Sequence, residues 1–306
     1  MDIRTLRLAG REVPDSFELT TGQDTVLRVA QVLRLLPGKR LVALAQLGGR
    51  KIIAKLFYAG RRAQRHAQRE KVGLLVLAAK GVPAPTFLDM RPLGDDAWLV
   101  EVQYLSPAES AGSRWRRVTA EGLVGADPLA ALMPLVELMG QMHAAGLCQK
   151  DLHLDNFLWH AGILKVIDGG SVQTCKRRRK IEGNLGLLLA QLPLTVAFPL
   201  QPVLSAYQRG NPKTTLSPAQ LERVVARQRQ RRVRNYLKKT MRDCQEFLVA
   251  RAWRRFTVVA RAEAQALSEV LADPDTTMGL GIPLKLGNTS TVVRFNLGGR
   301  ELVIKR

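Results

Sequence analysis

The stretch CQKDLHLDNFLWHAGILKVIDGG, residues 148–170, places Asp151, Asn156 and Asp168 around one loop and one hairpin. Four residues separate Asp151 from Asn156, and Asp168 follows a short apolar run with strand propensity. Carboxylate and amide oxygens are the ligands that hold magnesium in phosphoryl-transfer sites. A carboxylate can also orient an acceptor hydroxyl and take its proton. The spacing therefore favours phosphoryl transfer, with Asp151 as the base and with Asn156 and Asp168 as magnesium ligands.

A lysine and a glutamate earlier in the chain supply the other charges that phosphoryl transfer needs. Lys55 ends the strand-prone segment RKIIAKL, and Glu70 lies fifteen residues later in the helix-prone segment QRHAQREKVG. A strand lysine held by a helix carboxylate can grip the phosphates of ATP. Lys55, Glu70 and Asp151 are therefore the predicted catalytic residues. Simpler roles stay open: a turn cap for Asp151, an exposed strand position for Lys55, or another acid such as Glu101 in place of Glu70.

The order of strand and helix signals predicts two lobes that bring these residues together. The expected elements are strands within about 26–58, a basic helix at about 61–80, two strands before 105, a helix from Asp127-Pro128, a hairpin at 157–168 and a long helix at 218–242. Strands first and helices later indicate an α+β, two-lobed enzyme. We expect a small β-rich N-lobe at 1–105, with a hinge at 101–105, and a larger helical C-lobe at 106–272 that carries the catalytic loop.

An internal repeat sets the C-terminal end of the chain apart. LPGKRLVALAQLGGRKIIAKL, residues 36–56, aligns without gaps with LGNTSTVVRFNLGGRELVIKR, residues 286–306. In each copy a Gly-Gly pair, the signal of a two-residue hairpin turn, leads into a strand with a lysine near its end, Lys55 or Lys305. We interpret residues 273–306 as a linker and the truncated start of a second copy, whose remainder is missing here. A coincidence between two similar hairpins is the alternative.

Composition and charge indicate a globular protein with an anionic partner. The net charge of +21 favours nucleic acid, an anionic membrane surface, or a phosphorylated or acidic substrate. Three cysteines, with no signal peptide and no run long enough to span a bilayer, make the cytoplasm the expected compartment. An aromatic content of 5% and the lack of a zinc or RNA-binding motif argue against nucleic acid.

Two basic segments are candidates for contact with the anionic partner. One tract lies just after Asp168 and includes Lys176, Arg177, Arg178 and Arg179. Guanidinium groups suit phosphate and carboxylate, so this tract is the expected contact for the acceptor; a solvated loop is the plain alternative. The arginine-rich helix at 218–242 is expected to make peripheral contact with anionic lipid headgroups.

The segments KDLHLDNFLW and ILKVIDGG resemble the catalytic loop and the metal-binding segment of the protein-kinase-like superfamily. Within it, RNYLKKTMRDCQEF, DPD and LGNTSTV are similar to segments of tandem proteins related to lipopolysaccharide core heptose and Kdo kinases. The resemblance covers about residues 25–270. It implies a kinase dependent on ATP and Mg²⁺ that phosphorylates a sugar of the lipopolysaccharide core, an anionic glycolipid. It also implies a cytoplasmic protein peripheral to the inner membrane of a Gram-negative bacterium.

The resemblance extends to the nucleotide-binding residues. It implies that Gly38 of LPGKRLV lies in the phosphate-binding loop, and that adenine packs against the hinge strand EVQYL. The expected hinge contacts, made by the backbone, are Glu101, Gln103 and Leu105.

Two positions depart from the pattern of the superfamily. Gln149 replaces the loop histidine, and Gly169 replaces the aromatic residue of Asp-Phe-Gly, so switching by aromatic packing is not expected. A single glycine, Gly38, also makes a weak phosphate nest. The alternatives are therefore a protein or small-molecule kinase with the same catalytic set, and a pseudokinase scaffold that binds nucleotide without turnover.

Overall fold

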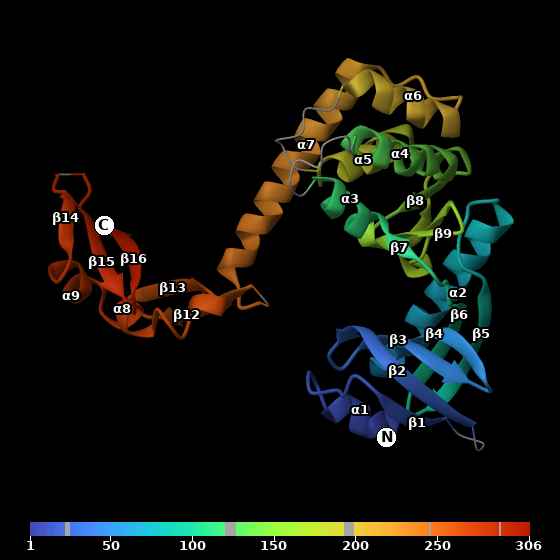
Figure 1. Ribbon diagram of the computed structural model, residues 1–306, viewed down its shortest axis with the longest axis horizontal. Coiled ribbons are helices and arrows are strands. Elements are labelled where there is room, and N and C mark those ends of the chain that lie inside the picture. The colour runs from blue at the N-terminus through green and yellow to red at the C-terminus, as the bar shows by residue number, and fades with distance from the viewer. Residues whose placement is uncertain (22–24, 120–126, 193–198, 245, 288) are drawn as a thin grey trace. The chain divides into compact units, whose positions relative to one another are not determined.

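The computed structural model describes residues 1–21, 25–119, 127–192, 199–244, 246–287 and 289–306 (Figure 1). The chain forms two compact units, Met1–Arg229 and Gln230–Arg306. The first unit contains all five residues for which chemistry is expected: Lys55, Glu70, Asp151, Asn156 and Asp168.

The N-terminal lobe of the first unit is built on one antiparallel sheet with strand order β1-β2-β3-β4-β6-β5. Its strands are β1 (Phe17–Thr21), β2 (Thr25–Leu36), β3 (Arg40–Leu47), β4 (Arg50–Phe57), β5 (Phe87–Gly94) and β6 (Ala97–Gln103). Helix α1 (Ile3–Leu8) precedes the sheet, and α2 (Ala63–Ala79) connects β4 to β5. The expected β-rich lobe is confirmed. Helix α1 and strand β1 were not expected from the sequence.

The two faces of this sheet have different partners because side chains alternate along a strand. Ala54 and Leu56 of β4 lie in a buried core that also contains Leu6 of α1. Lys55 lies between them and so points to the other face. On that face Val100, which pairs with Lys55 across β4 and β6, packs with Ala67 of α2. The alternation therefore places the lysine on the side of the sheet that carries α2.

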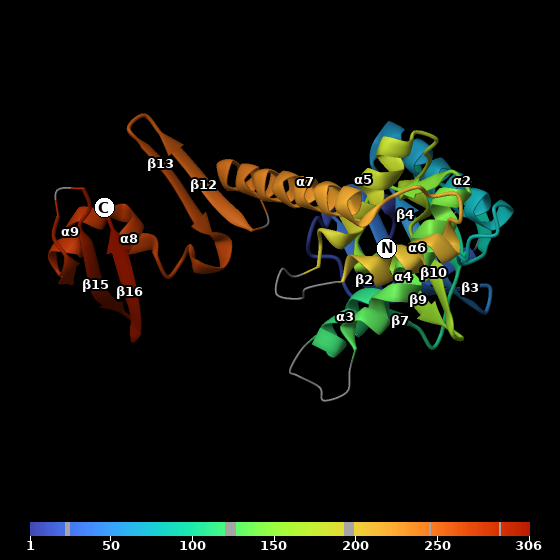
Figure 2. The ribbon, with the colours of Figure 1, turned by 90° about the horizontal axis from the view of Figure 1, so that it is seen from above.

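The second lobe of the first unit is mainly helical. Its helices are α3 (Ala111–Thr119), α4 (Pro128–Ala144), α5 (Arg178–Leu189), α6 (Leu200–Gly210) and the part of α7 (Pro218–Leu237) up to Arg229. Asp127 caps α4 by accepting from the backbone N–H of Leu129, as the Asp-Pro start predicts. Helices α4 and α6 lie side by side in both views (Figure 1, Figure 2). Gly140 and Gly210 permit this contact, because a Cβ on Gly210 would lie 2.1 Å from the carbonyl oxygen of Glu137.

Short strands hold the predicted catalytic loop against the helical lobe. They are β7 (Glu109–Ser110), β8 (Leu147–Gln149), β9 (Phe157–His160), β10 (Ile163–Val166) and β11 (Val172–Thr174). The pair β9–β10 is the hairpin expected from the sequence. The pair β8–β11 brings the start of the catalytic loop beside the segment that follows Asp168.

The second unit contains a hairpin, two short helices and a three-stranded sheet. The hairpin is β12 (Phe247–Ala252) with β13 (Arg255–Ala260), the helices are α8 (Ser268–Ala272) and α9 (Pro274–Gly279), and the sheet is β14 (Ile282–Lys285), β15 (Val292–Leu297) and β16 (Arg300–Lys305). The sequence placed residues up to 272 in the C-lobe, whereas 230–272 belong to the second compact unit. The segment expected as a linker contains α9, which contacts β15.

The two hairpins of the internal repeat have the same register. Val42 pairs with Lys55 and Val292 with Lys305, and all six pairs of β15–β16 match pairs of β3–β4 at a shift of 250 residues (292 − 42). Both Gly-Gly turns have positive φ angles: 54° and 78° for Gly48 and Gly49, 57° and 84° for Gly298 and Gly299. Such turns need glycine-like residues at both positions. The sequence repeat thus coincides with a local likeness between two hairpins.

Candidate active site

Lys55 and Glu70 form a buried ion pair on the α2 side of the sheet. The Lys55 Nζ donates to the Glu70 Oε1 at 2.5 Å, and the Glu70 side chain is fully buried. Burial of a lone lysine or glutamate would be costly, whereas a hydrogen-bonded pair offsets much of that cost. Lys55 also donates to the carbonyl oxygen of Ile167, 3.0 Å away. The ammonium group therefore lies beside the residue that precedes Asp168.

Glu70 connects α2 to the segment around Asp168. Its Oε1 accepts from the backbone N–H of Gly169 at 3.1 Å, and its Oε2 accepts from that of Gly170 at 2.9 Å. The helix approaches so closely that a Cβ on Gly73 would lie 1.9 Å from the Gly169 carbonyl oxygen. A side chain at 169 has no room either, because its Cβ would lie 2.6 Å from the Glu70 carbonyl oxygen. Gly73 was not identified from the sequence, where its only signal is a glycine in a helix-prone segment.

Asp168 is held by two neighbours. Its backbone carbonyl oxygen accepts from the Gln149 Nε2 at 3.2 Å, and its Oδ2 accepts from the Ser171 Oγ at 2.8 Å. Gln149 stands where the superfamily pattern has histidine, and it anchors the Asp168 backbone from a fully buried position. Among the described residues, no hydrogen bond engages the Asp168 Oδ1. That oxygen is therefore the atom left for a cation.

The predicted catalytic loop orients Asn156 and leaves the Asp151 carboxylate accessible. The Asn156 Nδ2 donates to the backbone carbonyl oxygen of Asp151 at 2.8 Å. With its nitrogen engaged, the buried amide presents its oxygen as the free atom. The Asp151 side chain is 50% exposed, and its Oδ1 lies 3.1 Å from the His153 Nε2. Asp151 is thus open to an incoming group, as a base must be.

A buried polar network supports this loop from the helical lobe. The Asn184 Nδ2 donates to the Gln149 carbonyl oxygen at 2.7 Å, and the Asn184 Oδ1 lies 3.1 Å from the His143 Nε2. The His143 Nδ1 lies 2.8 Å from the Tyr207 hydroxyl. Burial lowers the pKa of His143 to about 4 from its ordinary value of 6.5. His143 is therefore neutral at physiological pH. Asn184 and Tyr207 had no signal in the sequence, because these partners come from separate helices.

The predicted nucleotide-binding positions have mixed environments. Gly38, with φ of 65°, lies in a tight turn closed by the Lys39 N–H and the Leu36 carbonyl oxygen. The Gln103 side chain accepts from the backbone N–H and the hydroxyl of Thr86, so it is already engaged. Leu105 is buried beyond the end of β6, and no backbone hydrogen bond engages its N–H in the described part of the chain.

The Glu101 carboxylate points away from Lys55, across the sheet. It is fully buried and pairs with Arg50, whose Nη2 lies 3.0 Å from its Oε2, and with Arg91. Glu101 pairs in register with Ala54, on the face opposite to Lys55. Its side chain therefore stabilises the sheet. Any contact with a nucleotide would come from the backbone, as expected from the sequence, and Glu101 does not replace Glu70 as the lysine partner.

The basic tract that follows Asp168 is exposed. Lys176 and Arg177 precede α5, and Arg178 and Arg179 begin it. Arg178 pairs with Glu182 one turn later, at 2.6 Å. The remaining cations of the tract are open to solvent, a position that suits either the expected acceptor contact or a plain solvated surface.

Asp168 and Asn156 provide a small set of oxygen ligands for a cation. Their free atoms, a carboxylate oxygen and an amide oxygen, are hard donors. Within the described ranges no group of three or more His, Cys, Asp or Glu side chains could hold a metal by itself. A pair of oxygen donors fits Mg²⁺ in particular, since that ion is usually held by one or two protein ligands together with phosphates and water.

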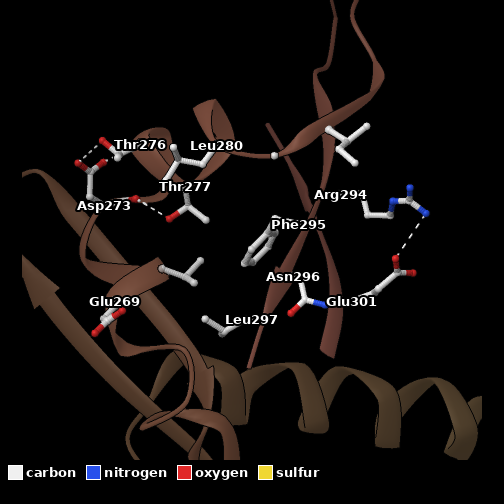
Figure 3. Close-up of a pocket in the computed structure, with 13 residues that line it drawn as sticks. Glu269, Asp273, Thr276, Thr277, Leu280, Arg294, Phe295, Asn296, Leu297 and Glu301 are labelled. Carbon is white, nitrogen blue, oxygen red and sulfur yellow. Dashed lines mark hydrogen bonds and ion pairs between the residues drawn. The ribbon is translucent and has the colours of Figure 1, made fainter. Parts of the chain in front are cut away.

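A cavity of about 590 Å³ lies in the second unit, away from these residues in the sequence (Figure 3). Phe295 projects into it from β15. Its polar lining serves local structure: Asp273 caps α9, and Arg294 lies 3.5 Å from Glu301. Lys305, the counterpart of Lys55, is exposed and has no carboxylate partner among the described residues.

The first unit has the arrangement of a protein-kinase-like fold. The lysine-bearing strand, the following helix with its glutamate, and the loop that carries Asp151 and Asn156 occur in the order and the contacts that this fold requires. Gly169, which follows Asp168, donates to Glu70, so the predicted metal-binding segment lies beside the Lys–Glu pair.

Comparisons with solved structures find many similar chains, two of which are described here. No protein-family model and no curated protein matches the sequence. A structure described as "WaaP in complex with acyl carrier protein" has 22% identity and a TM-score of 0.46, covering 68% of this chain and 87% of that one. A structure described as "Crystal structure of BubR1 kinase domain" has 13% identity and a TM-score of 0.45, covering 74% of this chain and 87% of that one.

Proposed function

We propose that this protein is an ATP-dependent kinase that phosphorylates a sugar hydroxyl, of heptose or Kdo, in the lipopolysaccharide core. The observation that carries the proposal is the Lys55–Glu70 ion pair fixed to the backbone of Gly169 and Gly170. A buried ion pair by itself adds little net stability, because the cost of desolvation offsets the attraction between the charges. These contacts fix the Lys55 ammonium group near Asp168, where a kinase needs it to bind the phosphates of ATP.

In the proposed reaction each residue has one task. Lys55 binds the donor phosphates, and Glu70 fixes its position. The acceptor hydroxyl oxygen bonds to the γ-phosphorus of ATP as the bond from that phosphorus to the bridging oxygen of ADP breaks, and Asp151 takes the hydroxyl proton. Asn156 and Asp168 would hold Mg²⁺, which neutralises phosphate charge when bound. Leu105 and its neighbours would meet the adenine through the backbone.

The test is phosphate transfer to a defined acceptor. Purified protein is incubated with γ-labelled ATP, Mg²⁺ and lipopolysaccharide core oligosaccharide, and label in the sugar is measured. Label that disappears with Asp151→Ala, in a variant that still unfolds cooperatively, supports the proposal. No transfer to core sugars by a protein that does bind Mg·ATP would contradict it.

The acceptor and location follow from charge and sequence resemblance. With a net charge of +21 the protein would associate with an anionic membrane surface, and the tract of Lys176, Arg177, Arg178 and Arg179 would meet the anionic acceptor. We place the protein in the cytoplasm, at the inner membrane of a Gram-negative bacterium. No helix in the described part of the chain has the length and apolar character needed to cross a membrane.

A pseudokinase is the second candidate, and a specific observation favours it. The turn at Gly38 has one glycine and is closed by its own hydrogen bond, so it offers few free N–H groups to phosphates. A pseudokinase would show no transfer to any acceptor. A protein or small-molecule kinase would transfer phosphate to another acceptor in a panel. Thermal stabilisation by ATP that requires Mg²⁺ separates a kinase from a scaffold that does not need the metal.

We further propose that residues 273–306 are the start of a second kinase-like copy. The support is the identical register of the β3–β4 and β15–β16 hairpins. If so, Lys305 occupies the position equivalent to Lys55, and substitution of Lys305 should leave nucleotide binding by the first unit unchanged.

A further inference from the structure

A second concave site borders the catalytic loop on the outer side of α2. A groove with a volume of about 660 Å³ lies between α2 and the segment that follows Asp168. Arg61, Arg65 and Arg69 line one wall, and Lys150 and Gln173 lie on the other. No aspartate or glutamate is among its described lining residues.

The cations of this groove are concentrated and unpaired. Arg65 and Arg69 are four residues apart and so share one face of α2, where like charges disfavour the helix. Arg61 lies in the short 3-10 turn just before α2, and it lines the same groove. All three are exposed, and within the described chain none lies within ion-pairing distance of a carboxylate, nor does Lys150. Other exposed arginines of the same unit, such as Arg223 and Arg227, also lack an acidic partner among the described residues. The three groove arginines differ from them because they line one hollow together with Lys150.

The positive field is strong enough to affect a neighbouring group. Partial burial lowers the pKa of His66 on α2, and the charges of Arg69 and Arg65 lower it further. A helix that tolerates such repulsion, without acids to relieve it, gains stability when an anion enters the groove.

Hydrogen bonds connect the lining of the groove to the proposed catalytic residues. The Lys150 N–H donates to the Ser171 carbonyl oxygen at 2.8 Å, and Ser171 in turn donates to the Asp168 carboxylate. Lys150 also directly precedes Asp151 in the sequence. A ligand held between Arg65, Arg69 and Lys150 would therefore lie beside the catalytic loop.

We propose that this groove binds phosphate groups carried by the acceptor, at a site separate from the one that receives the new phosphate. Guanidinium groups bind phosphate through two parallel hydrogen bonds, and several of them facing one hollow select a ligand with clustered phosphates. A concave groove suits phosphates on a flexible saccharide better than the flat surface of a bilayer. This inference rests on the proposed function and specifies how the acceptor is recognised.

The experiment measures binding without ATP, so that it does not depend on catalysis. The probe is deacylated core oligosaccharide that retains its phosphates, compared with the same material after chemical dephosphorylation. The variant is Arg65→Gln/Arg69→Gln. The matched control is Arg223→Gln/Arg227→Gln, which removes two exposed arginines at the same spacing from α7.

We expect the groove variant to bind the phosphorylated probe about tenfold or more weakly, because each lost charge-assisted contact is substantial. The α7 control should bind like the original protein, and the dephosphorylated probe should bind weakly to every form. Equal binding of the phosphorylated probe by the groove variant and the control would overturn the inference.

Binding to vesicles of phosphatidylcholine with phosphatidylglycerol tests the other possible source of phosphate, the headgroups of membrane lipids. If the groove variant loses vesicle binding but keeps oligosaccharide binding, the groove meets the membrane and the inference is wrong. If the groove-dependent binding is present but labelled ATP transfers no phosphate to the probe, the binding site stands and the proposed function fails.

Discussion

The Nζ of Lys55 and the Oε1 of Glu70 lie 2.5 Å apart although the residues are fifteen positions apart in the chain, and the same oxygen accepts from the N–H of Gly169. This carboxylate is thus the junction of the lysine strand, helix α2 and the Asp168 segment. Disturbing any of the three should disturb the other two.

Replacing Lys55 with methionine should abolish phosphate transfer and also lower the free energy of unfolding, because buried Glu70 loses its ion partner. The substitution keeps an apolar stem but removes the charge beside Asp168, and loss of one such positioned donor costs about 100-fold or more in kcat. Steady-state transfer assays measure the effect. Lys305→Met is the matched control, since it removes a lysine from the equivalent place in β16 and should leave the rate unchanged. A similar loss in both variants would contradict the assignment.

Asp151→Asn should reduce transfer about 100-fold to 10,000-fold, the range for loss of a general base. The side chain is half exposed and makes no buried contact, so stability should hardly change. Affinity for Mg·ATP, measured by calorimetry, should also persist because Asn156 and Asp168 remain. Equal losses of nucleotide affinity and rate would mean that Asp151 binds the nucleotide and does not serve as a base.

Gly73→Ala should reduce activity through α2. In an unconstrained helix the change would stabilise the protein by about 1 kcal/mol. Here the new methyl carbon would meet the Gly169 carbonyl oxygen at 1.9 Å, so α2 must move and the Glu70 hydrogen bonds to Gly169 and Gly170 must lengthen. We expect lower kcat together with a lower melting temperature. Gly279→Ala in α9, where an added Cβ would meet no described atom within 4 Å, is the control and should show neither effect.

Glu101→Gln should destabilise the N-terminal lobe without a specific loss of catalysis. The change weakens a buried group that pairs with Arg50 and Arg91, at a cost of about 1–3 kcal/mol. Denaturant unfolding measures this cost. Activity per folded molecule should stay near normal, whereas Glu70→Gln should lower activity sharply. An inactive but stable Glu101→Gln variant would show that the carboxylate has a role in the nucleotide site.

Because of His143, the free energy of unfolding should fall as the pH is lowered. Its folded pKa of about 4 lies below the ordinary value of 6.5, so the unfolded chain binds a proton more readily. Neutral His143 makes its full contribution to the free energy of unfolding above pH 6.5. That contribution is lost as the pH falls from 6.5 toward 4, at about 1.4 kcal/mol per pH unit. Unfolding free energies measured across that range test this. His143→Gln should flatten the slope, whereas His153→Gln, at an exposed position, should not.

The sequence by itself determined the chemical groups and the order in which they occur. The spacing of Asp151 and Asn156, the apolar run before Asp168 and the strand that ends near Lys55 are local features, because strand alternation and loop spacing depend on neighbouring residues. The hairpin turns were predictable for the same reason: Gly-Gly pairs adopt positive φ angles that other residues avoid.

Only the tertiary structure decided which acid meets Lys55, because that choice depends on contacts between segments far apart in the chain. Glu70 and Glu101 were both candidates in the sequence, and side-chain alternation on β6 turns Glu101 to the opposite face of the sheet. The close approach of Gly73 to Gly169, the anchoring of Asp168 by Gln149, and the gathering of α2 arginines beside Lys150 likewise arise from packing between elements. Long-range packing of this kind leaves no periodic trace in a single sequence.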